Sequence, residues 1–355
     1  MRLVIDCFKL VKGKGKSIGI YNLAQNLAQH LTDTNRNGER CEEIIVLGNE
    51  YNRKDFDIPG IRFIQMKGNP LNKLTCIVWE LFIVPFQARK YKADRILFPR
   101  GYRPLFYRGK DTVIIHDLIP FFYDKYFPGV LNRVENAYIM SRLKASMKHA
   151  DRIITISEFS RREIDAMCPG SGKRVRVIYN GLNEVKCSRD KCALIPEEPY
   201  IYAAASGLPH KNAAGVLKTY DAYYHQTQHP ARLIVVGIPN TDGYEISSEA
   251  ASHVTCYKYI ESSEDMHSLL AGARVFLFLS LIEGFGFPPL EAMQLGVPVV
   301  CSDRTALAEV VGDAGLLTDP DNYAQSVKCL NRVLTEEELR QQLIKKGYEN
   351  VKRFG

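Results

Sequence analysis

Two acidic residues flank a glycine- and proline-rich turn in the second half of the chain. Residues 283–292 read EGFGFPPLEA, so Glu283 and Glu291 lie eight positions apart, and an apolar run at 275–279 precedes them. This order predicts a strand, a tight turn and a helix whose first turn contains proline. Free backbone N–H groups at such a helix start favour an anion, and nearby carboxylates can accept hydrogen bonds from hydroxyl groups. An anion with hydroxyls beside it describes a sugar nucleotide.

The complete string resembles the Glu-x7-Glu motif of retaining glycosyltransferases of family 4, which have the GT-B fold. The resemblance implies that Glu283 binds sugar hydroxyls as a catalytic residue and that Glu291 binds the ribose hydroxyls. It also implies that the donor phosphates lie against the turn residues Gly286, Phe287 and Pro288. A buried strand-to-helix turn in an unrelated α/β protein is the alternative reading of the same residues.

A lysine at a second predicted helix start adds positive charge. The segment Gly207-Leu208-Pro209-His210-Lys211-Asn212 follows an apolar run at 200–204, and a lysine there strengthens an anion site at a helix end. In family 4 a Lys-Asn or Lys-Gly pair at this place holds the donor diphosphate, so Lys211 and Gly207 are candidate donor-binding residues. Relatives often carry an arginine close by, where this chain has His210 and Ala205. A solvated lysine is the alternative.

The loop after the first predicted strand is rich in glycine and lysine. Residues 12–21 read KGKGKSIGIY. A P-loop requires a glycine separated by four residues from Gly-Lys-Ser, and the dinucleotide fingerprint requires G-x-G-x-x-G, so neither motif fits. The loop resembles the first loop of family 4 enzymes, which lies near the acceptor and the donor phosphate, and this makes Gly13, Gly15 and Gly19 candidate site residues. A surface loop without a ligand is the alternative.

His116 ends an apolar run and begins the string His116-Asp117-Leu118-Ile119-Pro120. A lone histidine is more often structural than catalytic. The string resembles the His-Asp-Leu-x-Pro segment of many family 4 sequences, and this resemblance implies a role for His116 beside the sugar or the acceptor hydroxyl.

Short apolar runs alternate with amphipathic ones along the whole chain, which predicts parallel sheets covered by helices on both faces. The length of 355 residues predicts two domains. Asn180-Gly181 and the polar stretch up to Pro199 predict a linker. We therefore expect an α/β, GT-B protein with two Rossmann-like, doubly wound domains facing a central cleft. Residues 1–181 would bind the acceptor and residues 182–355 the sugar nucleotide, with a final crossing helix that is short or truncated.

Charge is distributed unevenly between the two halves. Residues 1–180 hold 31 Lys+Arg and 18 Asp+Glu, a balance of +13, whereas residues 181–355 have a balance of −6. The first half would attract an anionic partner, or it has a basic surface without one. Between Lys73 and Lys110 an apolar segment, 79–86, precedes seven basic residues: Arg89, Lys90, Lys92, Arg95, Arg100, Arg103 and Arg108. This pattern fits either a segment that lies on an anionic membrane or a core helix followed by a solvated loop.

The remaining features exclude several classes of protein. No apolar run is long enough to span a membrane, and the nine cysteines show neither C-x-x-C nor metal-ligand spacing, as expected in a reducing cytoplasm. No aromatic-basic motif supports nucleic-acid binding. Asp319-Pro320-Asp321 spells the metal signature of a different transferase fold, and we interpret it as a turn.

The resemblance implies a metal-independent, retaining transferase without a cofactor. It would move a hexose, with mannosyl slightly favoured, from a nucleoside-diphosphate sugar to a glycan or lipid-linked glycan. The reaction would belong to surface polysaccharide synthesis, lipopolysaccharide included, at the inner face of the plasma membrane. A catalytically inactive sugar-nucleotide scaffold and a P-loop-like nucleotide hydrolase are the alternatives.

Overall fold

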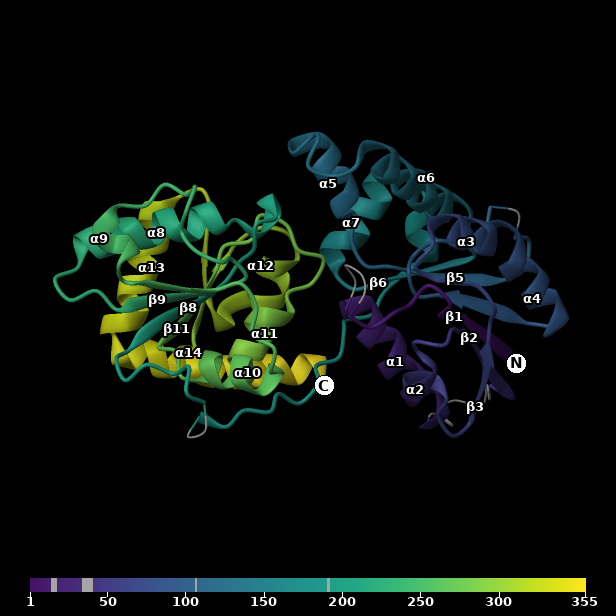
Figure 1. Cartoon of the computed structure of the whole chain (residues 1–355), viewed down its shortest axis with the longest axis horizontal. Coiled ribbons are helices and arrows are strands. Elements are labelled where there is room, and N and C mark those ends of the chain that lie inside the picture. The colour runs from purple at the N-terminus through teal and green to yellow at the C-terminus, as the bar shows by residue number, and fades with distance from the viewer. Residues whose placement is uncertain (14–17, 34–40, 106, 190–191) are drawn as a thin grey trace. The chain divides into compact units, whose positions relative to one another are not determined.

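The computed structural model describes residues 1–13, 18–33, 41–105, 107–189 and 192–355. The chain forms two compact units, Met1–Ile178 and Tyr179–Gly355 (Figure 1). Each unit has its own parallel sheet. The division lies close to the Asn180-Gly181 turn, and the described residues between Tyr179 and Pro199 contain no strand and no α-helix.

Unit 1 contains a seven-stranded parallel sheet in the order β3-β2-β1-β4-β5-β6-β7. Its strands are β1 Arg2–Asp6, β2 Glu43–Gly48, β3 Ile61–Gln65, β4 Arg95–Phe98, β5 Asp111–Ile115, β6 Arg152–Thr155 and β7 Val175–Val177. Its α-helices are α1 Ile18–Asp33, α2 Arg53–Phe56, α3 Lys73–Val78, α4 Val84–Lys90, α5 Ile119–Tyr126, α6 Arg133–His149 and α7 Glu158–Met167. A π-helical turn, η1 Trp79–Ile83, joins α3 to α4, and a 3-10 turn, η2 Ser171–Arg174, precedes β7.

Alternation along the buried strands of unit 1 divides its apolar side chains between two cores. Leu3 and Ile5 pack with residues of α1 and α2 on one face of the sheet. Val4 packs on the other face with residues of η1, α4, α6 and α7, and Figure 1 shows α1 and α2 on the side opposite α3 and α6. A sheet buried on both faces is what near-continuous apolar strands require.

Unit 2 contains a six-stranded parallel sheet in the order β10-β9-β8-β11-β12-β13. Its strands are β8 Tyr200–Ala204, β9 Arg232–Val236, β10 Val254–Tyr257, β11 Val275–Phe278, β12 Val299–Ser302 and β13 Leu316–Thr318. Its α-helices are α8 Ala213–Gln226, α9 Ser248–Ala251, α10 Ser263–Ala271, α11 Phe287–Gln294, α12 Thr305–Val311, α13 Tyr323–Thr335 and α14 Glu337–Val351. Among the described residues, 3-10 turns include η4 Pro209–Lys211, η5 Gly312–Ala314 and η6 Lys352–Phe354.

The strand order reverses between β1 and β4 in unit 1, and between β8 and β11 in unit 2. Loops at the carboxyl ends of two such neighbouring strands diverge to opposite faces, which leaves room for a ligand between them. The doubly wound architecture expected from the sequence is therefore present in both units. In the described part of the chain, no helix has the length and apolar character needed to cross a membrane.

Candidate active site

The loop after β11 contains the acidic motif, and Gly286 allows its turn. Gly286 has φ +133°, and a Cβ atom there would approach Cδ2 of Leu307 to 2.9 Å. Glycine is needed because side-chain-bearing residues rarely adopt this conformation and the space is already filled. Helix α11 starts at Phe287 with prolines in its first turn. Pro288 has no N–H, so it can shape the turn but cannot donate to a phosphate.

The loop after β8 is tied to the loop after β11 through Asn212. This residue has φ +53° and caps α8, because its Oδ1 accepts a hydrogen bond from the Gly215 N–H at 3.0 Å. Its Nδ2 donates to the Leu279 carbonyl at 2.9 Å, and the Leu281 N–H donates to the His210 carbonyl at 2.7 Å. The two loops at the switch point of unit 2 are thereby held in one arrangement.

Lys211 and Glu283, predicted as separate site residues, form an ion pair. The Lys211 Nζ lies 2.6 Å from Oε1 of Glu283, and their side chains are 29% and 13% exposed. Nζ also lies 5.8 Å from the ring centroid of Phe278, at the end of β11. An anion that binds Lys211 therefore competes with Glu283 for this cation.

Thr305 supports the same loop, and sequence reasoning missed it. Its Oγ1 accepts a hydrogen bond from the Glu283 N–H at 3.1 Å, and its φ is +61°. A β-branched residue in the left-handed region is strained, by about 1–3 kcal/mol, and such strain concentrates at functional sites. No pattern in the sequence indicates a threonine with this conformation.

Glu291 lies on α11 in a setting that differs from that of Glu283. Burial raises the pKa of its carboxyl above the usual value. Within the residues that the structure describes, no hydrogen bond or ion pair is recorded for this carboxylate. A half-buried carboxyl without a cation can accept hydrogen bonds from ligand hydroxyls, which fits the predicted ribose contact without testing it.

His210 and Gly207 complete the loop after β8. Burial, with Lys211 beside it, lowers the pKa of His210 to about 4. The histidine that replaces an arginine of relatives is therefore neutral at pH 7 and adds no charge to the site. Gly207 is exposed, and a Cβ atom there would meet no neighbour.

His116 lies in unit 1, directly after β5, and is structurally engaged. Its Nε2 makes a 2.8 Å hydrogen bond to the Pro99 carbonyl, and its own carbonyl accepts from the Ser160 hydroxyl at 3.3 Å. Burial lowers its pKa to about 4, so the imidazole is neutral at pH 7. It lies at the carboxyl edge of the sheet, where the predicted catalytic role requires it, and that role stays a prediction.

The glycine loop of unit 1 is described only in part. Gly13 has φ +73°, and Gly19 lies in the first turn of α1; a Cβ atom at either would meet no neighbour. Gly15 lies outside the described residues.

The Asp319-Pro320-Asp321 string is a turn, as predicted. Both carboxylates pair with Arg304, at 2.7 and 2.6 Å. Across the described ranges, no group of three or more histidine, cysteine or acidic residues could hold a metal ion.

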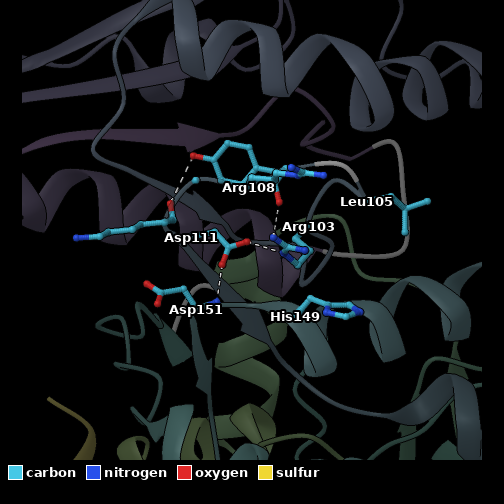
Figure 2. Close-up of a pocket in the computed structure, with 9 residues that line it drawn as sticks. Arg103, Leu105, Arg108, Asp111, His149 and Asp151 are labelled. Carbon is cyan, nitrogen blue, oxygen red and sulfur yellow. Dashed lines mark hydrogen bonds and ion pairs between the residues drawn. The ribbon is translucent and has the colours of Figure 1, made fainter.

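A surface cavity of about 570 Å³ lies at the opposite edge of the unit 1 sheet. It is lined by residues around the amino ends of β5 and β6, including Asp111 and Asp151 (Figure 2). Buried Arg103 also lines it and pairs with Asp111 at 2.6 Å. Ligands of doubly wound sheets bind at the carboxyl ends of strands, so we assign the site to the loops after β8 and β11 and not to this cavity.

Comparison with known families finds two matching domains. The model described as Glycosyltransferase Family 4 matches residues 19–186, and the model described as Glycosyl transferases group 1 matches residues 187–350. Together they cover both units.

Two curated relatives are bacterial mannosyltransferases. The chain is 30% identical over 297 residues to O-antigen chain mannosyltransferase B of Escherichia coli, covering 74% of this chain and 76% of the relative. It is 26% identical over 215 residues to O-antigen chain mannosyltransferase RfbU of Salmonella typhimurium, covering 59% and 57%.

Solved structures share the fold over nearly the whole chain. WaaG, a glycosyltransferase involved in lipopolysaccharide biosynthesis, superimposes with a TM-score of 0.70 at 15% identity, covering 99% of this chain and 95% of WaaG. Anabaena HepE in complex with UDP and glucose gives 0.68 at 16% identity, covering 100% and 95%. Matching domains in both units, a relative at 30% identity and GT-B neighbours along the whole length agree with the motif at Glu283. The chain therefore belongs to the group 1 glycosyl transferases of family 4 and has the GT-B fold.

Proposed function

We propose that this protein is a retaining, metal-independent hexosyltransferase that uses a nucleoside-diphosphate sugar, with a mannosyl donor favoured. The similarity to two O-antigen mannosyltransferases supports both the choice of mannose as the sugar and the choice of pathway. The acceptor is a glycan or lipid-linked glycan in lipopolysaccharide or related surface polysaccharide synthesis. Such an enzyme works in the cytoplasm at the inner face of the plasma membrane, where its donor is made and its acceptor is anchored.

A nucleotide-sugar donor is supported by the loops after β8 and β11. HepE, which shares the fold, is known with UDP and with UDP-glucose. Loss of a nucleoside diphosphate builds negative charge on the leaving phosphate, and preorganised positive charge there lowers the barrier. Lys211 and the backbone N–H groups of the turn before α11 supply that charge, so no metal or cofactor is required.

Each predicted site residue then has a role. Diphosphate competes with Glu283 for Lys211, and Glu283 turns to the sugar hydroxyls when the donor binds. Glu291 accepts hydrogen bonds from the ribose. Neutral His116 donates its Nε2–H to the Pro99 carbonyl, so its Nδ1 is left to accept a hydrogen bond from a hydroxyl near the anomeric carbon, and the glycine loop receives the acceptor. Retention of configuration follows if the departing phosphate takes the acceptor proton on the same face of the sugar.

A donor screen tests the proposal. The full chain is heated with UDP-, GDP- and ADP-sugars, and the preferred donor, at 100 times its Kd, should stabilise the native state by about 2.7 kcal/mol. Transfer of sugar from that donor is then followed with and without EDTA, and the transfer rate should be unchanged by chelation. Loss of transfer with EDTA and recovery with Mg²⁺ or Mn²⁺ would contradict the metal-free site. Donor binding without transfer to any glycan would favour the inactive scaffold, and nucleotide hydrolysis without a sugar would favour the hydrolase.

A further inference from the structure

One helical segment of unit 1 presents a row of exposed apolar side chains. Helix α3, the π turn η1 and helix α4 follow each other without a break from Lys73 to Lys90. Along them Leu74, Val78, Phe82 and Phe86 are 73%, 47%, 62% and 63% exposed. Single exposed apolar residues are ordinary, but an ordered row of four on one segment marks an interaction surface.

The π turn keeps this row in line. The four residues are spaced by four, and in a straight α-helix such a row drifts around the axis, because a turn holds 3.6 residues. In η1 the Val84 N–H bonds to the Trp79 carbonyl, an i→i+5 link that places more residues in the turn. The drift is thereby reduced where Val78 gives way to Phe82.

The opposite side of the segment is anchored in the unit. Trp79 is fully buried, stacks on Phe8 with ring centroids 4.1 Å apart, and donates to Asp6 at 3.0 Å. Glu80 is also buried, pairs with Lys9 and accepts from the Tyr138 hydroxyl at 2.6 Å. The segment is therefore fixed by one side, and the apolar row faces outward from a stable position.

The start of α6 extends the apolar surface. Lys73 pairs with Glu135 at 3.0 Å, which joins the first turns of α3 and α6. Val134 beside that pair is 81% exposed, and Figure 1 shows α3 and α6 on the same side of the unit.

The charges around the row are almost all positive. From residue 67 to residue 92 the only acid is Glu80, which is buried, whereas the basic residues are all exposed: Lys67, Lys73, Arg89, Lys90 and Lys92. An apolar row with a cationic border complements the headgroups and acyl chains of an anionic membrane. A water-soluble protein partner would have to offer both an apolar groove and an acidic border.

Other arginines of the predicted basic stretch do not take part. Arg95 pairs with Asp151 and is 12% exposed, and Arg103 is buried against Asp111. Arg100 donates to the Lys9 carbonyl. The side chains of Arg95, Arg100 and Arg103 are therefore held by contacts within unit 1, and the cationic border of the row is formed by the exposed residues Arg89, Lys90 and Lys92.

We propose that Leu74, Val78, Phe82 and Phe86 insert into an anionic lipid surface, with Arg89 and Lys90 on its headgroups. This deepens the proposed function, since it names the surface by which the enzyme reaches a lipid-linked acceptor. It does not depend on the choice of donor. Because the same segment carries Trp79 and Glu80 on its inner side, membrane contact would be made next to the carboxyl end of β1.

Vesicle co-sedimentation of the full chain tests the proposal. Wild-type protein should bind vesicles of phosphatidylcholine mixed with phosphatidylglycerol at 0.1 M salt. Binding should fall steeply by 1 M salt, as the Debye length falls from ~10 Å to ~3 Å. The pair Phe82→Ser and Phe86→Ser, and separately the pair Arg89→Gln and Lys90→Gln, should each weaken vesicle binding by roughly tenfold or more.

Matched controls come from unit 2. Tyr259→Ser removes an aromatic side chain that is 76% exposed, and Lys328→Gln with Lys345→Gln removes two exposed cations; both variants should bind vesicles like wild type. Circular dichroism and donor affinity should be unchanged in every variant. Failure of the proposed function would appear in the donor screen, whereas failure of the membrane proposal would appear only in vesicle binding. The proposal would be overturned if the wild-type protein did not bind anionic vesicles at low salt. It would also be overturned by serine variants that bind normally, or by a wild-type dimer that the serine variants convert to monomer without a change in vesicle binding.

Discussion

The ion pair between Lys211 and Glu283 determines how the candidate site can respond to a ligand. An anion that reaches Lys211 weakens this pair, and Glu283 must then find other donors because it is only 13% exposed. Sugar hydroxyls are suitable donors. Diphosphate binding and engagement of the sugar would thus be coupled through one contact.

This contact predicts unequal effects of removing the two acids. Glu283→Ala leaves Lys211 free for the diphosphate, so donor affinity should change by no more than about threefold. Glu291→Ala removes a charge-assisted contact worth about 1.5–3 kcal/mol, so donor affinity should fall roughly tenfold or more. Isothermal titration with the preferred donor measures both, and Glu338→Ala on the exposed surface of α14 is the control. Equal losses for the two variants would contradict the assigned roles.

His210 predicts a pH dependence of stability in unit 2. The pKa of His210 is about 4 in the folded chain and 6.5 ordinarily. Between pH 4 and pH 6.5 the histidine is therefore protonated in the unfolded state and neutral in the native state. The contribution of His210 to the free energy of unfolding therefore rises with pH from about 4 to 6.5, by about 3 kcal/mol in all.

His210→Gln should remove this slope. Urea midpoints measured from pH 4.5 to pH 7 should show the variant gaining stability relative to wild type as the pH falls, whatever its offset at pH 7. His229→Gln, at an exposed histidine, should keep the wild-type slope. Parallel curves for His210→Gln and wild type would contradict the assignment.

Part of this site could be predicted from residue types, and part could not. The motif at Glu283 and the lysine at 211 have recognisable neighbours in sequence. Their pairing joins positions far apart in the chain, and Thr305 supports Glu283 through a backbone conformation that no local pattern predicts. Asn212 was foreseen as a helix start, but its hydrogen bond to Leu279 depends on the strand order of the sheet.

At the scale of elements, buried parallel strands were the most predictable features. The expected apolar run at 200–204 has the same bounds as β8, and the run at 275–279 matches β11 to within one residue, because continuous apolar stretches between polar ones indicate strands in a doubly wound sheet. The edge strand β13, three residues long, and the polar helix α14 were not predicted. Both depend on packing against neighbours and not on a strong pattern of their own.

The last elements of unit 2 support the acidic loop. Phe354 in η6 is 2% exposed, and its ring lies 5.5 Å from Phe285 and 5.6 Å from Tyr179. Its carbonyl accepts from the Leu182 N–H at 2.8 Å. A single aromatic side chain therefore packs against both the start of unit 2 and the Gly-Phe-Gly-Phe turn.

Phe354→Ala should loosen that turn. Truncating a buried phenylalanine costs about 3–5 kcal/mol, which for a unit of this size lowers the Tm by on the order of 10 °C. Hydrogen exchange of the peptide spanning 280–290 should speed up, and donor affinity should fall although Phe354 is not a predicted donor contact. Phe354→Leu, which keeps most of the volume, should stay close to wild type. Unchanged hydrogen exchange in the alanine variant would show that the turn keeps its conformation without the Phe354 ring.

At the scale of the whole molecule, charge and chemistry divide along the same boundary. Unit 1 carries the basic surplus and the apolar row, whereas unit 2 carries the Lys211–Glu283 pair in an acidic half. The hydrogen bonds described for the loops after β8 and β11 have both partners inside unit 2. The sequence predicted two doubly wound domains because their periodicity is local. It did not predict which basic residues face solvent, since that depends on tertiary packing.

Residues 179–355 should therefore fold and bind the nucleotide part of the donor when produced alone. This unit has its own buried core on one face of its sheet, formed with α8, α9 and α13. The ring of Phe354, near the end of the unit, packs against the ring of Tyr179 at its start. We expect one cooperative unfolding transition and a Kd for the nucleoside diphosphate within about tenfold of that of the full chain, since a change of 1.4 kcal/mol is tenfold. Sugar transfer should be absent, because His116 and the glycine loop lie in unit 1.

Glu291→Ala in the same fragment is the control and should weaken binding as it does in the full chain. A fragment that stays unfolded would show that unit 2 needs unit 1 in order to fold. A fragment that folds but binds no nucleotide bound by the full chain would mean that unit 1 contributes to the donor site directly.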